Sequence, residues 1–193
     1  QDTAFWLAVD HVLLTEFYRD SQVEYFESYA RQYTDLPLLV QVDDGKAGQY
    51  LRESAVQRYA EVENGEWKML MWDGEAGEAR MPNGGIGDRW ATKDKGHWNL
   101  ELVDSLLGAK ISPELSLIDC HDGTAEVEIE FFGEDGVIKR VVPVRTIETV
   151  DGPVEVTTVF DLMMARFGVN RGLGGFDAAD YDEDDVPYTP AWQ

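Results

Sequence analysis

Cysteine is nearly absent from this sequence of 193 residues, which contains Cys120 alone. A single cysteine excludes an internal disulfide and any metal cluster held by several cysteines within these residues. Long apolar runs are absent too, since none approaches the roughly 18 to 20 residues that a membrane-spanning helix needs. We therefore expect no direct membrane insertion by these residues, so that any membrane association comes through a partner.

Basic residues are also scarce, with 16 Lys and Arg against 38 Asp and Glu and a formal net charge of -22. This negative field repels nucleic acid and anionic lipid, which excludes nucleic acid as a partner. Hydrophobic residues still make up 44% of the chain, enough for a folded core. An acidic protein with only six lysines and a full core is typical of halophiles, in which salt screens self-repulsion. We expect such a fold to loosen at low salt; an ordinary acidic domain is the alternative.

The first helix is expected over residues 3–19, with Asp2 as its N-cap. Apolar side chains cover nearly every face of it, namely those of Phe5, Trp6, Leu7, Val9, Val12, Leu13, Leu14 and Phe17. A helix that is apolar on all sides is typical of the interior of a larger body. We therefore expect this helix to be buried and the stretch to be a fragment from inside a longer chain.

Residues 1–42 are expected to form a helix–helix–strand piece of an α/β domain. Apolar residues three and four apart predict a second helix over 23–33, which should end near Thr34 because Pro37 disfavours helical geometry in the residue before it. Residues 38–42 have the pattern of a short buried strand. Two helices, a turn and a buried strand indicate an α/β layered body.

Residues 43–155 are glycine-rich, and we expect a β-containing insertion there. Short strands are predicted at 67–72, 125–132, 137–144 and 146–150. Charged and apolar residues alternate over 126–132, which predicts a half-exposed strand, and a turn at 133–136 should pair it with the next strand as a hairpin. Asp151-Gly152-Pro153 should break the last of these strands.

Residues 156–193 are expected to return to the main domain as a helix and an acidic tail. The helix is predicted over 158–167, with Gly168 ending it. The acidic run at 180–185 superficially resembles a calcium loop, but it lacks the central glycine and the terminal glutamate at the required distance. We interpret that run as a solvated acidic surface.

The three histidines do not have the spacing of a metal site. His11 falls on the first helix and is expected to be a hydrogen-bonded core residue, while His97 and His121 lack ligand-like spacing with each other or with Cys120. The segment PNGGIGDRW at 82–90 holds the other candidate. Its three glycines lack a Cβ atom, so they allow left-handed backbone or the close approach of another group. Its functional interpretation is a contact loop at an intersubunit or interdomain surface, and the alternative is a structured surface turn with aromatics packed beneath. The side chains of interest are Arg89, Trp90, His97 and Trp98.

Several stretches, in order along the chain, carry a family resemblance. They are the opening Gln1-Asp2 with its helix, EYFESYARQYTDLPLLVQVDD at 24–44, EWK at 66–68, PNGGIGDRW at 82–90, GHWNLE at 96–101, VTTVFDLMMARFGVNRGL at 156–173 and YTPAW at 188–192. Together they make the chain similar to molybdopterin-guanine-dinucleotide oxidoreductases of the dimethyl sulfoxide reductase family. The match is specifically to catalytic alpha subunits of respiratory nitrate reductases, of which the chain would be a minor part.

The resemblance implies that Gln1 and Asp2 contact one guanosine end of a molybdenum-bis(molybdopterin guanine dinucleotide) cofactor. It also implies that electrons pass from quinol through a membrane cytochrome subunit and an iron–sulfur beta subunit, and that nitrate is reduced to nitrite. The molybdenum ligand, the ligands of a [4Fe-4S] cluster and the second nucleotide-binding region would lie outside these residues. No catalytic residue and no metal ligand is therefore expected here, and we expect the fragment alone to be inactive.

Two alternatives stay open at this point. One is a sibling molybdenum oxidoreductase acting on chlorate, perchlorate, selenate, dimethyl sulfide or a hydrocarbon. The other is a non-catalytic acidic assembly domain. The resemblance implies a subunit held at the membrane by its partners, on the extracytoplasmic face in a halophilic archaeon and on the cytoplasmic face in a bacterium.

Overall fold

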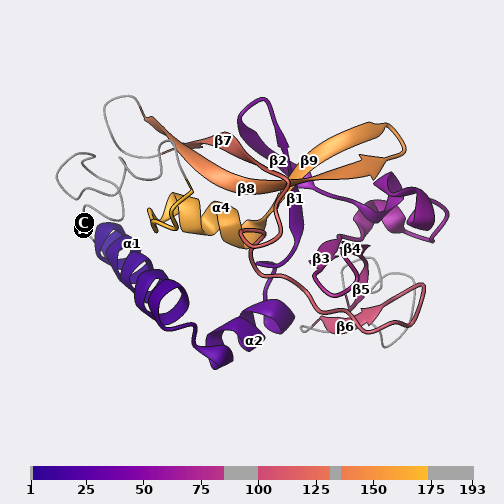
Figure 1. Cartoon of the computed structure of the whole chain (residues 1–193), viewed down its shortest axis with the longest axis horizontal. Coiled ribbons are helices and arrows are strands. Elements are labelled where there is room, and N and C mark those ends of the chain that lie inside the picture. The colour runs from indigo at the N-terminus through magenta and orange to yellow at the C-terminus, as the bar shows by residue number, and fades with distance from the viewer. Residues whose placement is uncertain (1, 85–99, 131–135, 174–193) are drawn as a thin grey trace.

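The fold is a mixed α/β arrangement in which a C-terminal helix packs against a curved antiparallel sheet and the N-terminal helices contact that helix (Figure 1). It was obtained as a computed structural model, which describes residues 2–84, 100–130 and 136–173. Within these ranges the main sheet has five strands in the order β2-β1-β9-β8-β7, and two smaller sheets pair β3 with β4 and β5 with β6. The expected combination of N-terminal helices, short strands and a C-terminal helix is confirmed at this level.

Three helical segments open the chain: α1 (Asp2–Leu13), the π-helix η1 (Leu14–Asp20) and α2 (Glu24–Tyr33). The predicted helices over 3–19 and 23–33 are confirmed, except that the last turns of the first have π geometry. The second ends where expected, because Thr34 adopts an extended backbone and its hydroxyl donates to the Ala30 carbonyl at 2.5 Å.

The prediction that the first helix is buried is wrong for this structure. No residue of α1 is buried, and the Phe5 and Trp6 side chains are 62% and 60% exposed. Only one stripe of the α1–η1 segment packs on the body, through His11, Leu14 and Tyr18. An apolar pattern shows that a helix avoids water, but it cannot show whether the covering groups belong to the same 193 residues.

The main sheet is built from β1 (Leu39–Asp43), β2 (Lys46–Tyr50), β7 (Gly123–Glu130), β8 (Val137–Thr149) and β9 (Gly152–Thr158). Its strands therefore come from two separate stretches of the chain, 39–50 and 123–158. The predicted strand at 38–42 is confirmed as β1, and the predicted pairing of the next two strands is confirmed as β7 and β8, which pair from Gly123–Val144 to Glu130–Val137. Most of the predicted turn at 133–136 lies outside the described residues.

Two strand predictions need correction. Residues 137–144 and 146–150 are not separate strands, because β8 runs through Arg145 and changes partner there, pairing with β7 up to Val144 and with β9 from Arg145. Gly152 and Pro153 do break β8, but they also begin β9, which was not expected. The turn is closed by the Thr149 hydroxyl, which donates to the Gly152 carbonyl at 2.6 Å.

Smaller elements lie beside and below the sheet, with β3, β4, β5 and β6 below it (Figure 1). These are the 3-10 turns η2 (Glu53–Ala55), η3 (Gln57–Tyr59) and η4 (Gly65–Trp67) and the strands β3 (Met71–Asp73), β4 (Glu78–Arg80), β5 (Pro82–Asn83) and β6 (Glu101–Asp104). The predicted strand at 67–72 survives only as the start of β3. Tight 3-10 turns precede it and leave few residues for extended backbone.

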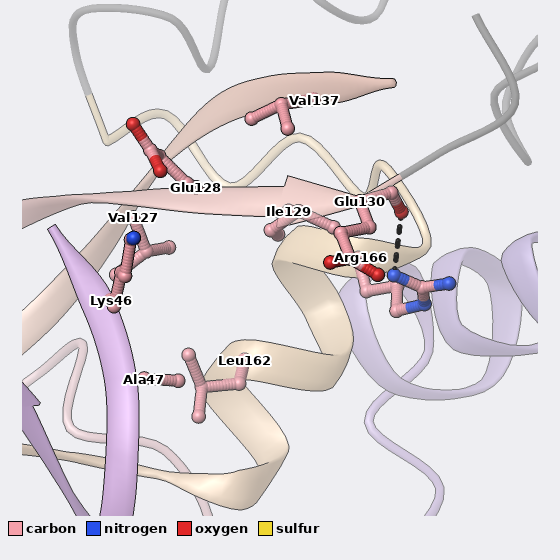
Figure 2. Close-up of a pocket in the computed structure, with 9 residues that line it drawn as sticks. All are labelled: Lys46, Ala47, Val127, Glu128, Ile129, Glu130, Val137, Leu162 and Arg166. Carbon is pink, nitrogen blue, oxygen red and sulfur yellow. Dashed lines mark hydrogen bonds between the residues drawn. The ribbon is translucent and has the colours of Figure 1, made fainter.

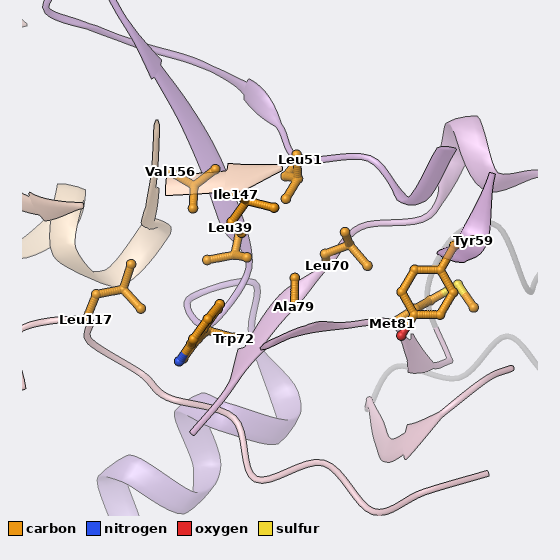
Figure 3. Close-up of a cluster of buried hydrophobic side chains, with 10 residues drawn as sticks. All are labelled: Leu39, Leu51, Tyr59, Leu70, Trp72, Ala79, Met81, Leu117, Ile147 and Val156. Carbon is orange, nitrogen blue, oxygen red and sulfur yellow. The ribbon is translucent and has the colours of Figure 1, made fainter. Parts of the chain in front are cut away.

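One core cluster joins the sheet to this lower layer (Figure 3). Leu39, Ile147 and Val156 come from the sheet, and Leu70, Trp72 and others come from the segments facing it. The C-terminal helix α4 (Val159–Arg166) has Thr158 as its N-cap, and Gly168 follows it with φ of +69°. The prediction for this helix is confirmed.

Candidate functional site

The first candidate site is the N-terminal end of α1, where the resemblance places a nucleotide contact. Asp2 is exposed in the first turn of the helix, where unpaired backbone N–H groups and the helix dipole favour an anion. Gln1 lies outside the described residues. Asp2, Phe5, Val9 and Val12 recur every three or four residues, so that they follow one stripe of the helix.

Beyond Asp2, the uncovered side of this helical segment is strongly apolar. We call this the α1 surface and define it as Phe5, Trp6, Val12, Leu13 and Phe17, each of which is more than two-fifths exposed. Phe5 and Trp6 pack edge to face, with ring centroids 5.5 Å apart. The α1 surface thus consists of apolar side chains along the exposed side of the segment, which also carries the exposed Asp2 and Glu16.

The opposite side of the segment is fixed to the body by His11, Leu14 and Tyr18, and Arg19 Nη1 adds a hydrogen bond to the Asn170 carbonyl at 3.3 Å. His11 Nδ1 lies 2.6 Å from the Phe167 carbonyl oxygen, and the carbonyl can only accept, so the imidazole N–H donates. Leu14 packs into the cluster that contains Phe160. The prediction that His11 is hydrogen-bonded is confirmed, although its half-buried side chain lies at the helix contact instead of deep in the core.

Tyr18 completes this contact. Its ring meets that of Phe160 edge to face, and burial, helped by the negative charge of Asp161, raises the Tyr18 pKa to about 12. The phenol therefore stays neutral at ordinary pH. These contacts hold one side of the α1–η1 segment against the body, while Asp2 and the residues of the α1 surface are exposed.

Asp161, on α4, is the centre of a buried polar network that sequence reasoning missed. Its carboxylate accepts from Ser116 Oγ at 2.6 Å, Leu117 N at 2.9 Å, Thr158 Oγ1 at 2.9 Å and Arg171 Nη1 at 2.5 Å. Neither side chain of the Asp161–Arg171 pair is exposed beyond 5%. The only local signal was the capping pattern Thr158-x-x-Asp161, in which the Asp161 N–H donates to the Thr158 hydroxyl.

A second buried carboxylate, Asp104, lies at the end of β6. The Tyr59 hydroxyl donates to it at 2.5 Å, and the Leu106 and Leu107 N–H groups donate to its other oxygen. Burial and this hydrogen bond raise the Tyr59 pKa to about 12. Arg80 adds an ion pair at 3.7 Å. Asp104 and Asp161 are therefore both occupied by protein donors, which is the arrangement of structural carboxylates and not of a free catalytic base.

Cys120 and His121 also have local structural roles. His121 Nδ1 donates to the Ile118 carbonyl at 2.7 Å, and burial, with the nearby Glu114 carboxylate, raises the pKa of the Cys120 thiol. A raised thiol pKa leaves little of the nucleophilic thiolate. Within the described ranges no group of three or more His, Cys, Asp or Glu side chains could hold a metal ion.

A groove of about 550 Å³ lies between the two edges of the sheet and α4 (Figure 2). Lys46 and Ala47 of β2 form one side, β7 forms the other, and Leu162 and Arg166 lie along the helix. Arg166 Nη1 donates to the Glu130 carbonyl at 2.7 Å. The charged side chains that line the groove are exposed, and among the described residues no cluster of polar groups points into it to bind a ligand.

The remaining candidate residues from the sequence lie outside the residues that the structure describes. Residues 85–99, with Arg89, Trp90, His97 and Trp98, lie outside the described residues, as does the acidic run at 180–185. Of the segment 82–90, the structure describes β5 and Gly84, which has φ of +84°.

No family model matches the chain. Curated relatives do match it, over almost all of its residues. It is 38% identical over 198 residues to the nitrate reductase alpha chain of Bacillus subtilis, an alignment covering 100% of this chain and 16% of that relative. The chain is homologous to nitrate reductase alpha chains.

Two further relatives are of the same kind. The homology extends to the respiratory nitrate reductase 1 alpha chain of Escherichia coli, with 39% identity over 99% of this chain and 16% of the relative. The respiratory nitrate reductase alpha chain of Bradyrhizobium sp is 37% identical over 100% of this chain and 19% of its own length. The chain thus spans less than one fifth of the length of these relatives.

Proposed function

We propose that this chain is part of the catalytic alpha subunit of a molybdenum-dependent respiratory nitrate reductase, which reduces nitrate to nitrite. The supporting observation is identity of 38% across the whole chain, without confinement to one motif. Because the chain covers only 16% of that relative, the activity would belong to a longer polypeptide. The 193-residue chain alone is expected to be inactive.

The contribution of this chain to cofactor binding would be made by Gln1 and Asp2. The Asp2 carboxylate is exposed at a helix start and accepts hydrogen bonds, which suits the N–H edge of a guanine ring. Bound molybdenum-bis(molybdopterin guanine dinucleotide) would supply the metal centre for oxygen-atom transfer from nitrate. The molybdenum ligand and the [4Fe-4S] ligands would lie elsewhere in the subunit.

The residues behind Asp2 would act as its support. The His11–Phe167 hydrogen bond and the Tyr18–Phe160 ring contact hold the α1–η1 segment on α4. The Asp161 network in turn fixes α4 to residues 116–117. A nucleotide contact at Asp2 would thereby be tied to the folded core.

Partners are proposed from the same homology: an iron–sulfur beta subunit, a membrane cytochrome subunit and nitrate. No helix of the described residues is long and apolar enough to cross a membrane. The parent subunit would be held at the membrane by its partners, facing outward in a halophilic archaeon or facing the cytoplasm in a bacterium.

A sibling oxidoreductase with another substrate is the second candidate. The exposed α1 surface argues against a free-standing assembly domain.

The first test is to isolate the native polypeptide that contains this sequence and to measure its intact mass, molybdenum content and guanine nucleotide content. A chain several times longer with stoichiometric molybdenum supports the proposal, and nitrate turnover separates it from the sibling enzymes. A native chain of 193 residues that binds no molybdenum would overturn it.

The nucleotide contact has its own test in the native subunit. Asp2→Asn should lower the affinity for the guanine end about 10- to 150-fold, the loss expected for a charged hydrogen bond. Asp10→Asn, farther along α1, serves as the matched control. Bound guanine nucleotide, released by denaturation and quantified, is the readout. Equal nucleotide content in the two variants would remove Asp2 from the site.

A further inference from the structure

The α1 surface is exposed among the residues that the structure describes, although its side chains avoid water. Phe5, Val12, Leu13 and Phe17 carry no polar side-chain atom, and the first of these is 62% exposed. Leaving apolar area in contact with water is unfavourable in proportion to that area. Contiguous apolar patches on a protein surface therefore mark places where other groups dock.

A comparison within the same region shows that exposure alone is not the argument. Tyr25, Tyr29 and Tyr33 on α2 are also exposed, and their rings stack at centroid distances of 6.2 and 5.1 Å. Tyrosine presents a hydroxyl that water can satisfy, so that these rings tolerate solvent. The α1 surface lacks such groups along most of its length.

The support of α1 by the described body is also slight. A helix of 12 residues is marginal by itself, since most helical stability comes from packing one face on a neighbour. No residue of α1 is buried, and the buried contacts begin only at Leu14 in η1. A second neighbour on the other side would supply the missing packing.

We propose that the α1 surface is an internal interface, covered by the remainder of a longer alpha subunit. This rests on the proposed function, because the relatives carry more than four fifths of their length beyond the region that matches this chain. A cover that belongs to the same polypeptide needs no separate association step, since its effective concentration is high. That favours it over a second copy of this chain.

The experiment compares the native long subunit with the 193-residue chain by hydroxyl-radical labelling and peptide mass spectrometry. Trp6 is the probe, and Trp67, which is 55% exposed on η4, is the internal reference. We expect labelling of Trp6 relative to Trp67 to fall several-fold in the long subunit. Within the 193-residue chain both tryptophans should be labelled freely at every protein concentration.

Two results would overturn the inference. One is equal labelling of Trp6 in the two forms, when the long subunit contains molybdenum and the proposed function therefore stands. The other is protection of Trp6 in the 193-residue chain that rises with concentration together with a dimeric mass, which would make a second copy the cover. The substitution Trp6→Ser, compared with Trp67→Ser, gives an independent reading. Only the first should increase proteolysis of the long subunit.

Discussion

Tyr18 and Phe160 meet edge to face with their ring centroids 4.5 Å apart, and this contact joins the N-terminal helical segment to α4. The two residues are far apart in the sequence but belong to one core cluster. Their packing adds a buried ring contact to the His11–Phe167 hydrogen bond and the Leu14 packing that also hold this segment.

We expect Tyr18→Ala to destabilise the fold by about 2–4 kcal/mol, because it removes a large ring from a packed cluster and leaves a cavity. Urea unfolding followed by far-ultraviolet circular dichroism measures the change. Tyr25→Ala is the matched control, since that ring is 77% exposed and its removal should change little. Equal effects of the two substitutions would contradict the docking role of Tyr18.

Asp161→Asn should destabilise the fold by about 3–5 kcal/mol, because it leaves the buried Arg171 guanidinium without its counter-charge. The control is Glu27→Gln, which removes the Arg31 partner on the surface of α2 and should cost about 0.5 kcal/mol or less. Chemical denaturation of the three proteins gives the comparison. If Asp161→Asn were as mild as the control, the network would not be a structural centre.

Alkaline pH should weaken the fold through Tyr18 and Tyr59. The pKa of each is raised to about 12 from 10, so the folded state favours the protonated phenol. The corresponding stability is fully present below pH 10 and is lost as pH rises from 10 to 12. Denaturation midpoints across this range test the expectation. Tyr59→Phe should reduce the pH dependence, and an unchanged pH dependence in that variant would contradict the role of the Tyr59 hydroxyl.

Salt should raise the stability of the chain because its net charge is -22. The Debye length falls from about 10 Å at 0.1 M to about 3 Å at 1 M ionic strength, which screens repulsion among the surface carboxylates. Thermal unfolding in increasing sodium chloride measures the effect, with an equal osmolarity of a neutral solute as the control. A melting temperature that does not respond to salt would remove the halophilic interpretation.

Local signals in the sequence were sufficient for several elements. Thr158 begins α4 through its N-cap hydroxyl, and Gly168 follows its end with a left-handed backbone. Both residue types are recognised helix-end signals, so the sequence alone located these ends. Pro37 likewise located the end of α2. The family resemblance was also visible in the sequence, because it depended on collinear stretches.

Other features depended on contacts between distant residues. The sequence predicted a break at Arg145, between strands at 137–144 and 146–150. In the structure its guanidinium lies 4.0 Å from the centre of the Trp72 ring, and its Nη1 donates to the Cys120 carbonyl. Those partners let a charged residue continue β8. The Asp161 network was similarly hidden, since Ser116 and Arg171 are 45 and 10 residues away along the chain.

The change of partner along β8 has a consequence for the order of folding. β7, β8 and β9 follow one another closely in the sequence, so their pairing is local, whereas β1 must pair with β9 across about 120 residues, as in the Leu39–Thr158 pair. Non-local pairing of this kind is slow. We expect pulsed hydrogen exchange during refolding to protect the amides of β7, β8 and β9 first. The pairing of β1 with β9 would then be the last event and would set the refolding rate.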